Sequence, residues 1–332
     1  MARTLGQSAP FHPALYDGLD GMKFPAAGGV FPTKDQMADY LQEYATRFAL
    51  PVASNMRVES LTREGDDFVA VCDGNTFVAG HVVVAISNYQ APRIPAFASE
   101  LGSSIRQLSA FEYSNSGELP AGPVLIVGVG NSGAEIAKDV VSTHPVLLAG
   151  KTTGELPFSV ASFLGRPVMV HLLNRIVFPR LLSVDTPIGR RARPRALTQH
   201  VPLIRVRSKD LDALGVQRVG RTVGARDGLP VLDDDSIVEV GSVIWCTGYT
   251  PGFRWIQMPV FDETGAPEHE RGVVGSMPGL YFVGLYFLTT MSSATVHGVS
   301  RDASRIAELV ADRARNGAGL GLDKPGREHA TI

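Results

Sequence analysis

Three glycines supply the first spacing that suggests chemistry. Gly128, Gly130 and Gly133 form a G-x-G-x-x-G turn, which follows the apolar run 124–127 and precedes residues that favour a helix. In such a turn the first glycine permits the tight bend, the second lets backbone approach a pyrophosphate, and the third lets the helix pack on the sheet. The amides and the dipole at the helix start would hold the phosphates. The turn therefore predicts a dinucleotide-binding site.

The residues after the next apolar run, 146–149, indicate which dinucleotide is expected. A cofactor with an unmodified ribose usually meets an Asp or Glu about 20 residues after the glycines. This chain has Gly150, Lys151, Thr152 and Thr153 at that point. A cation with two hydroxyls suits a 2′-phosphate, so we expect NADPH rather than NADH. The alternative interpretation is an ordinary glycine turn followed by a solvated lysine.

The composition excludes several other classes of function. The chain has 332 residues, enough for about two domains, and its 44% hydrophobic residues can fill their cores. Its 31 Lys and Arg nearly balance 33 Asp and Glu, so no overall field attracts nucleic acid. Cys72 and Cys246 have neither metal-ligand nor disulfide spacing, which favours a reducing compartment. We expect a cytoplasmic protein, because no secretion signal or transmembrane segment is visible.

Two segments of the second half have more than one interpretation. The segment 157–184 is apolar but interrupted by charges and prolines, which favours a packed helix pair over an element that rests on a membrane or lines a substrate entry. A basic run follows, with four arginines among two prolines and a glycine: Arg190, Arg191, Arg193 and Arg195. We expect a solvated loop there, and contact with an anionic ligand or the cofactor phosphate is the alternative.

The periodicity of the chain predicts an α/β fold that positions the glycine turn. Thr33 and Gln36 form a capping box, and the apolar residues after them fall on one face of a helix: Met37, Tyr40, Leu41, Tyr44 and Phe48. Strands are predicted at 52–54, 56–62, 68–72, 76–79, 82–86, 124–127, 146–149, 203–207, 216–219, 229–232, 243–246 and 280–283. A closing helix is predicted over 303–314.

Four motifs, in this order, resemble the flavin-containing monooxygenase family and its bacterial NAD(P)/FAD-dependent relatives. They are FPTKDQMADYL at 31–41, GVGNSGAEIA at 128–137, WCTGY at 245–249 and PGLYFVG at 278–284. The resemblance implies a Rossmann-like NADPH domain, residues 91–249, inserted in a second, FAD-type Rossmann-like domain, residues 1–90 and 250–315, with a flexible tail at 316–332. In such enzymes NADPH reduces the flavin, which takes up oxygen and oxygenates a small substrate.

The same resemblance assigns cofactor-binding residues. The pyrophosphate turn would be Gly128, Val129, Gly130, Asn131, Ser132 and Gly133, with Lys151 and Thr152 at the 2′-phosphate. Thr247, Gly248 and Tyr249 would form the crossing between the domains beside the nicotinamide. Gly284 would end a strand that approaches the flavin. Simple strand ends in a Rossmann-like sheet are the alternative interpretation of the last two groups.

Three departures from the family pattern concern the flavin. The sequence shows no strand and G-x-G-x-x-G for FAD ahead of the capping box, so we expect a truncated FAD-type domain. The family's A-T-G is Ala85, Ile86 and Ser87, and serine takes a close backbone turn less readily than glycine. The family's H-x-x-x-Y is Ser109 to Tyr113, without the histidine. We expect FAD binding to be degenerate or dependent on a partner, and we favour a homodimer that covers open strand edges.

Three functions remain open on these observations. The first is an NADPH-dependent oxidoreductase that oxygenates or reduces a small organic substrate with the help of FAD. The second is a flavin-free NADPH-dependent reductase, for which Tyr249, Tyr286, His297 and His171 are candidate proton donors by residue type. Isolated Tyr and His residues in apolar surroundings are more often packed core residues. The third is a catalytically inactive nucleotide-binding protein or truncated family member.

Overall fold

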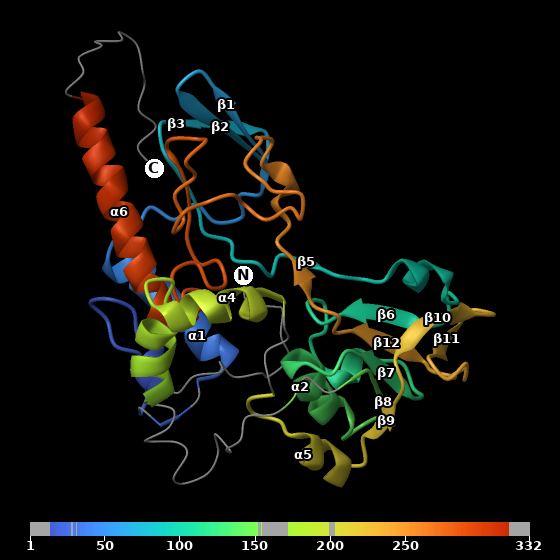
Figure 1. Cartoon of the computed structure of the whole chain (residues 1–332). Coiled ribbons are helices and arrows are strands. Elements are labelled where there is room, and N and C mark those ends of the chain that lie inside the picture. Colours follow the sequence, from blue (N-terminus) through green and yellow to red (C-terminus); the bar gives the residue numbers. More distant parts are fainter. Residues whose placement is uncertain are drawn as a thin grey trace.

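Two lobes make up the molecule, one built around a parallel sheet and one that joins an antiparallel ribbon to several helices (Figure 1). This computed structural model describes residues 14–27, 29–30, 32–151, 154, 172–198 and 203–318. We call residues 96–151 and 203–245 the sheet lobe, and residues 14–88, 172–198 and 253–318 the mixed lobe. The α/β class expected from the periodicity is confirmed.

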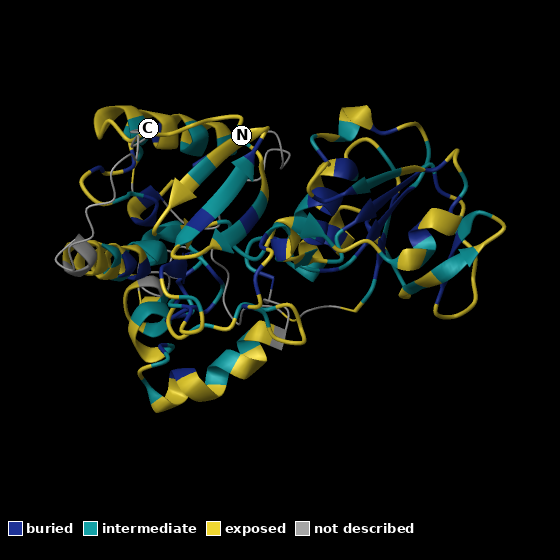
Figure 2. Cartoon of the chain, turned by 90° about the horizontal axis from the view of Figure 1, so that it is seen from above, coloured by how far each residue is buried: buried dark blue, intermediate teal, exposed yellow. Residues whose placement is uncertain are grey.

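Five parallel strands form the centre of the sheet lobe. Their order is β6 (Arg106–Ser109), β12 (Ser242–Trp245), β7 (Val124–Val127), β8 (Val146–Ala149) and β9 (Gln217–Val219). All four residues of β7 are buried, as expected for a parallel strand covered on both faces. Figure 2 shows buried residues gathered along this sheet. The order places β7, the strand that leads into the glycine turn, in the middle of the sheet.

Different elements cover the two faces of this sheet. One face carries α2 (Asn131–Val140) and α5 (Ser208–Ala213), which bury Ala134 and Leu211 against Ile126. The other face carries the 3-10 helix η2 (Ala96–Glu100) and the hairpin β10 (Thr222–Arg226) and β11 (Leu229–Leu232). A short 3-10 helix, η3 (Ser116–Glu118), precedes β7. The sheet lobe is therefore a three-layer unit with its strands buried in the middle layer.

The mixed lobe combines a ribbon, a strand pair and helices. Its antiparallel ribbon consists of β1 (Val58–Glu64), β2 (Asp67–Cys72) and β3 (Asn75–Ala79), and β4 (Val82–Val84) pairs in parallel with β14 (Leu280–Phe282). Its helices are η1 (Ala14–Tyr16), α1 (Lys34–Arg47), the π-helix η5 (Leu173–Leu181), α4 (Pro187–Thr198), η6 (Phe253–Trp255) and α6 (Val296–Ala318). Both hydrogen bonds of the predicted capping box are present at the start of α1.

Two connections between the lobes pair with each other. β5 (Ala91–Pro92) and β13 (Tyr249–Thr250) form a short antiparallel pair, and Figure 1 shows β5 between the lobes. Beside this pair, the amide of Arg93 donates to the carbonyl of Gly248 at 2.9 Å, and the Thr247 hydroxyl donates to the Arg93 carbonyl. The two connections therefore form one narrow ribbon instead of two independent linkers.

A third connection joins the lobes through the segment 172–198. This segment lies between β8 and α5 in the sequence, yet it packs on the mixed lobe. The amide of Met291 donates to the carbonyl of Leu182 at 3.0 Å, and the amide of Val184 donates to the carbonyl of Thr289 at 2.9 Å. The guanidinium of Arg301 on α6 also donates to the Pro179 carbonyl at 2.9 Å. The chain thus leaves the sheet lobe after β8 and returns to it before α5.

Two predicted strands are wrong, and several predicted boundaries shift, such as that of the first ribbon strand, which spans Val58–Glu64 instead of 56–62. No strand forms at 52–54, because Ala49 and Asn55 have φ angles of 48° and 59° and turn the chain on either side. None forms at 203–207 either, because the amide of Arg207 donates to Asp210 Oδ2 at 3.1 Å and starts α5. The strand predicted at 82–86 ends at Val84, and the closing helix begins at Val296 instead of residue 303.

The basic run predicted to be a loop is the helix α4. Thr186 and Pro187 explain why a helix starts at this point. The hydroxyl of Thr186 accepts from the amide of Gly189 at 2.9 Å, which is an N-cap hydrogen bond, and Pro187 occupies the first helical position, where its missing amide costs nothing. Gly189 also lies against backbone, since a Cβ there would be 1.9 Å from the Ser183 carbonyl oxygen.

Candidate functional site

The glycine turn follows β7 at the carboxyl end of the parallel sheet, where ligands of such sheets bind. Its three glycines have different surroundings. Gly128 has a φ of 112°, and a Cβ there would lie 2.3 Å from the Cys246 carbonyl oxygen. A Cβ on Gly133 would lie 1.9 Å from the Gly128 carbonyl oxygen, whereas a Cβ on Gly130 would meet no described atom within 4 Å. Two glycines therefore permit close packing, and Gly130 faces open space.

The amino end of α2 lies beside that open space. Gly130 caps the helix with extended backbone and no side-chain hydrogen bond, and the first helical bond runs from the Ala134 amide to the Gly130 carbonyl at 2.9 Å. Helix geometry leaves the amides before Ala134 outside the helical ladder. The Asn131 side chain accepts from the Ile204 amide at 2.9 Å, and Glu135 pairs with Arg205 at 3.4 Å. The backbone of Ile204 and the side chain of Arg205 thus contact the first two turns of α2 from the side.

The predicted 2′-phosphate position lies at the end of β8. Gly150 has a φ of 123°, and its amide donates to the Val219 carbonyl at 3.4 Å. Lys151 follows directly, is exposed, and forms no ion pair with another described residue. Thr152 and Thr153 lie outside the described residues. Lys151 is therefore an exposed cationic side chain next to the glycine turn.

The junction between the lobes gathers strand ends from both of them. Thr247, Gly248 and Tyr249 follow β12 of the sheet lobe, and Gly248 has a φ of 90° with no described atom within 4 Å of a Cβ position. The Tyr249 ring lies 5.9 Å from the Tyr89 ring, edge to face, and Tyr89 follows β4 of the mixed lobe. Of the crossing residues predicted beside the nicotinamide, Tyr249 thus contacts the segment that follows β4.

A second link ties the ends of β4 and β14 together. The Asn88 side chain accepts from the Tyr286 amide at 2.6 Å. Gly284, the residue predicted to approach the flavin, has a φ of 77° and open space at its Cβ position. Ser87 also has a left-handed φ of 65°, so serine here takes the conformation that glycine favours, at a cost of about 1–2 kcal/mol. The altered A-T-G motif therefore keeps a glycine-like turn.

Burial shifts the pKa of several groups at the junction. It raises the pKa of the phenols of Tyr89, Tyr249 and Tyr286, so all three stay protonated and can donate hydrogen bonds at neutral pH. Neighbouring groups act in the same direction, with Cys246 raising the pKa of Tyr249 and Tyr89 raising that of Tyr286. Burial also raises the pKa of the Cys246 thiol to about 12, which leaves it protonated and unreactive.

Other predicted candidates lie elsewhere. His297 is in the first turn of α6, with its ring 6.0 Å from the Tyr16 ring, and His171 lies outside the described residues. Tyr113, from the motif that lacks the family histidine, is buried and donates to Asp139 Oδ2 at 2.5 Å, which fixes α2. Asn88 and Tyr89 are not among the site residues expected from the sequence, because their only local signal is that polar residues follow a predicted strand.

The part of the chain that the structure describes contains neither a metal-binding cluster nor a membrane-spanning helix. No three His, Cys, Asp or Glu side chains in it are grouped so that they could hold a metal ion. None of its helices is long and apolar enough to span a membrane.

Comparisons with known proteins show what the chain is similar to. Residues 22–154 match the family described as pyridine nucleotide-disulphide oxidoreductase. An uncharacterized CzcO-like oxidoreductase of Geobacillus kaustophilus is 34% identical over 295 residues, covering 88% of this chain and 82% of that protein. Indole-3-pyruvate monooxygenase YUCCA6 of Arabidopsis thaliana is 25% identical, covering 89% and 77%. The flavin-containing monooxygenase from Stenotrophomonas maltophilia superposes with a TM-score of 0.69 and 23% identity, covering 94% of this chain and 87% of that one.

Fold and site together define an oxidoreductase of the two-lobed flavoprotein class. The chain belongs to the CzcO-like oxidoreductases, which are of the flavin-monooxygenase type. The family resemblance expected from the four sequence motifs is therefore confirmed.

Proposed function

We propose that this chain is an NADPH-dependent oxidoreductase that oxygenates or reduces a small organic substrate. The turn from Gly128 through Val129, Gly130, Asn131 and Ser132 to Gly133 would hold the NADPH pyrophosphate. Lys151 and Thr152 would bind the 2′-phosphate. The observation that carries the proposal is the open space at Gly130, because the other two glycines are explained by backbone contacts alone. A glycine with no packing requirement, at a helix start, suits the close approach of a phosphate.

The residues at the junction fit a nicotinamide and a flavin. Thr247, Gly248 and Tyr249 would lie beside the nicotinamide, and Gly284 with Ser87 would border the flavin ring. NADPH supplies a hydride when bound, and FAD supplies an electron carrier that reacts with oxygen. The three protonated tyrosines can donate hydrogen bonds to a substrate oxygen.

We further propose that FAD binding is degenerate or is completed by a partner chain. The sequence holds one G-x-G-x-x-G turn, and that turn belongs to the sheet lobe. Val83 on β4 is 44% exposed, which supports a second copy that covers this strand in a homodimer. The two cysteines are unpaired thiols, which supports the cytoplasm as the location. The relative named as an indole-3-pyruvate monooxygenase supports oxygenation of a small organic molecule.

A flavin-free reductase is the second candidate. The position of Tyr249 supports it, since a phenol is protonated at neutral pH and, beside the domain crossing, could deliver the proton that carbonyl reduction needs. The two candidates differ in a visible property. Purified protein that is yellow and releases FAD on denaturation supports the flavin enzyme, and colourless protein that consumes NADPH with a carbonyl compound supports the reductase.

The test of the cofactor assignment uses Lys151→Asp, with Lys209→Asp as a matched control on exposed residue Lys209 of α5. A carboxylate at position 151 repels a 2′-phosphate, so Lys151→Asp should weaken NADPH binding at least tenfold and NADH binding less than twofold. The control should leave both affinities unchanged. Calorimetric titration measures the four affinities. Equal affinities for NADPH and NADH in the unmodified chain would refute the assignment.

A further inference from the structure

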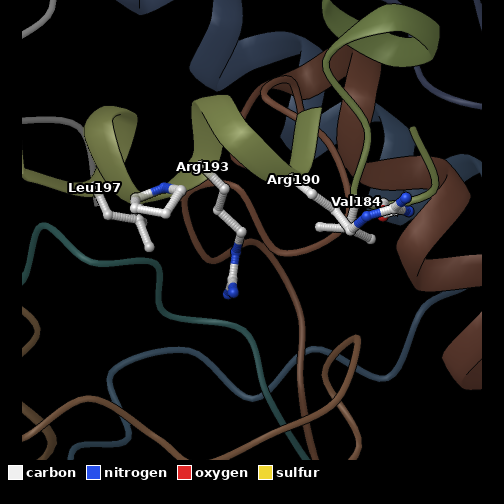
Figure 3. Close-up of a pocket in the computed structure, with 5 residues that line it drawn as sticks. Val184, Arg190, Arg193 and Leu197 are labelled. Atoms are coloured by element: carbon white, nitrogen blue, oxygen red, sulfur yellow. Dashed lines mark hydrogen bonds between the residues drawn. The ribbon is translucent and has the colours of Figure 1, made fainter. Parts of the chain in front are cut away.

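Two adjoining pockets lie along α4 on the mixed lobe. The larger, of about 490 Å³, is lined by Val184, Arg190, Arg193, Pro194 and Leu197 (Figure 3). The smaller, of about 220 Å³, shares Val184 and Arg193 and adds His269, Glu270, Arg271 and Leu288. Because Arg193 lines both pockets, its guanidinium stands where the two meet. The volumes together are in the range of a small-molecule site.

The guanidinium of Arg193 is held at one end and open at the other. Its Nε donates to the carbonyl of Phe287 at 3.1 Å. Its two terminal nitrogens make no hydrogen bond or ion pair with a described residue, and Figure 3 shows the side chain extending away from α4. Phe287 follows Gly284 by three residues, so the bond ties Arg193 to the segment that leaves the flavin-side strand β14.

The other cations around these pockets are already engaged. Arg190 folds back, and its Nη1 donates to the carbonyls of Val184 and Asp185 at 3.2 and 3.1 Å. Arg271 pairs with the Asp185 carboxylate. Arg193 therefore offers the open positive charge among the described residues that line either pocket.

The remaining polar neighbour of Arg193 carries no charge that opposes an anion. His269 Nδ1 accepts from the Gly272 amide at 3.1 Å, so the ring is neutral with its proton on Nε2. Burial, and secondly the charge of Arg193, lower the pKa of His269 to about 4. Glu270 is exposed and forms no ion pair with Arg193 among the described residues. Around Arg193 the lining thus provides a neutral ring, two engaged arginines and the exposed carboxylate of Glu270, which does not pair with Arg193.

The rest of the lining is apolar. Val184, Pro194, Leu197 and Leu288 contribute aliphatic surface, and Leu197 is 50% exposed, although it is a large hydrophobic side chain. A ligand that suits this lining has an apolar body and one anionic end. A planar guanidinium with two open terminal nitrogens matches a carboxylate in a bidentate arrangement.

We propose that Arg193 binds the carboxylate of an apolar carboxylic acid, which this oxidoreductase takes as its substrate. The role of the acid as substrate rests on the proposed function, whereas its binding at Arg193 does not. The bond to Phe287 then has a purpose, because it fixes the guanidinium relative to the strand end that borders the flavin. Arg191 and Arg195 of the same helix line neither pocket, and Arg190 is engaged by backbone carbonyls.

The test compares four forms of the full chain: unmodified, Arg193→Gln, Arg193→Lys and the matched control Arg191→Gln. Arg191 is an exposed arginine of the same helix, so the control removes the same charge outside the pockets. Calorimetry measures the binding of phenylacetate, octanoate, the neutral isostere phenylacetamide, and NADPH. Thermal unfolding followed by circular dichroism confirms that each variant is folded.

We expect both carboxylates to bind the unmodified chain and the control within twofold of each other. Arg193→Gln should weaken both at least tenfold, and Arg193→Lys should give an intermediate loss, because lysine keeps the charge without the fork. Phenylacetamide should bind the unmodified chain more weakly than phenylacetate does, and Arg193→Gln should leave the affinity for phenylacetamide unchanged.

Three results would overturn the proposal. The first is that neither carboxylate binds the unmodified chain, and the second is that Arg193→Gln and Arg191→Gln weaken carboxylate binding equally. The third is that Arg193→Gln weakens NADPH binding and leaves carboxylate binding unchanged, which would assign Arg193 to a cofactor phosphate. NADPH binding without carboxylate binding would refute the substrate class and leave the cofactor assignment standing. Carboxylate binding without NADPH binding would do the reverse.

Discussion

Alanine at two positions of the glycine turn should separate binding from folding. At Gly130 the backbone has φ −81° and ψ −174°, which alanine adopts without strain, and the Cβ meets no described atom within 4 Å. Replacing glycine in a permitted conformation stabilises a protein by roughly 0.4–1 kcal/mol through the unfolded chain. Alanine is a poorer N-cap than glycine, which opposes this gain by about the same amount. Gly130→Ala should therefore change the free energy of unfolding by less than about 1 kcal/mol.

The same change at Gly133 meets backbone. Its Cβ would lie 1.9 Å from the Gly128 carbonyl oxygen and 3.4 Å from the Cys246 Cβ, and neither the turn nor the buried strand end can move aside easily. Overpacking of this kind costs about 1–3 kcal/mol, and a backbone contact belongs at or above the upper end. Gly133→Ala should thus lower the free energy of unfolding by about 3 kcal/mol or more.

Urea unfolding followed by circular dichroism measures the stability of both variants, and calorimetry measures NADPH binding. Gly130→Ala should bind NADPH at least tenfold more weakly, a loss of about 1.4 kcal/mol or more, because its methyl group occupies the space that a phosphate would enter. A Gly130→Ala variant with unchanged NADPH affinity would refute the phosphate assignment. A Gly133→Ala variant as stable as the unmodified chain would refute the packing argument.

Three further predictions concern other residues. Burial raises the pKa of Asp17 from 3.8 to about 7, so its stabilising contribution is complete below pH 4 and is lost as the pH rises through 7. Asp17→Asn should remove this decline and raise the free energy of unfolding at pH 8 by a few kcal/mol at most. Urea unfolding measures this free energy, and equal pH profiles for the variant and the unmodified chain would contradict the prediction. Tyr113→Phe should cost about 1–3 kcal/mol, because it removes the hydrogen bond to Asp139, without altering NADPH affinity in calorimetry. Tyr249→Phe should lower the turnover number while NADPH affinity stays within twofold, and unchanged turnover would exclude the phenol as a donor.

Local signals predicted the elements that depend on neighbouring residues. The capping box at Thr33 and the alternation of the ribbon are properties of a few consecutive residues, and both are found as expected. The start of α4 was also readable in principle, because Thr186 and Pro187 are an N-cap and a first helical residue. The arginines and Pro194 instead favoured the prediction of a loop.

The rest depends on contacts between distant segments. Tyr89, Tyr249 and Tyr286 come together from three strand ends that no local pattern connects. The packing of 172–198 on the mixed lobe likewise rests on backbone hydrogen bonds such as that between Met291 and Leu182. Sequence periodicity reports which face of an element is apolar, but it does not report which other element that face meets.

The segment 172–198 has a mechanical consequence for the enzyme. Its backbone hydrogen bonds to Thr289 and Met291, and the bond from Arg193 to Phe287, hold α4 against the mixed lobe. The paired β5 and β13 strands are the link between the lobes that the structure describes, so a relative turn of the lobes would take place at that pair. Such a turn would leave the pockets along α4 unchanged, because every described residue that lines them belongs to the mixed lobe.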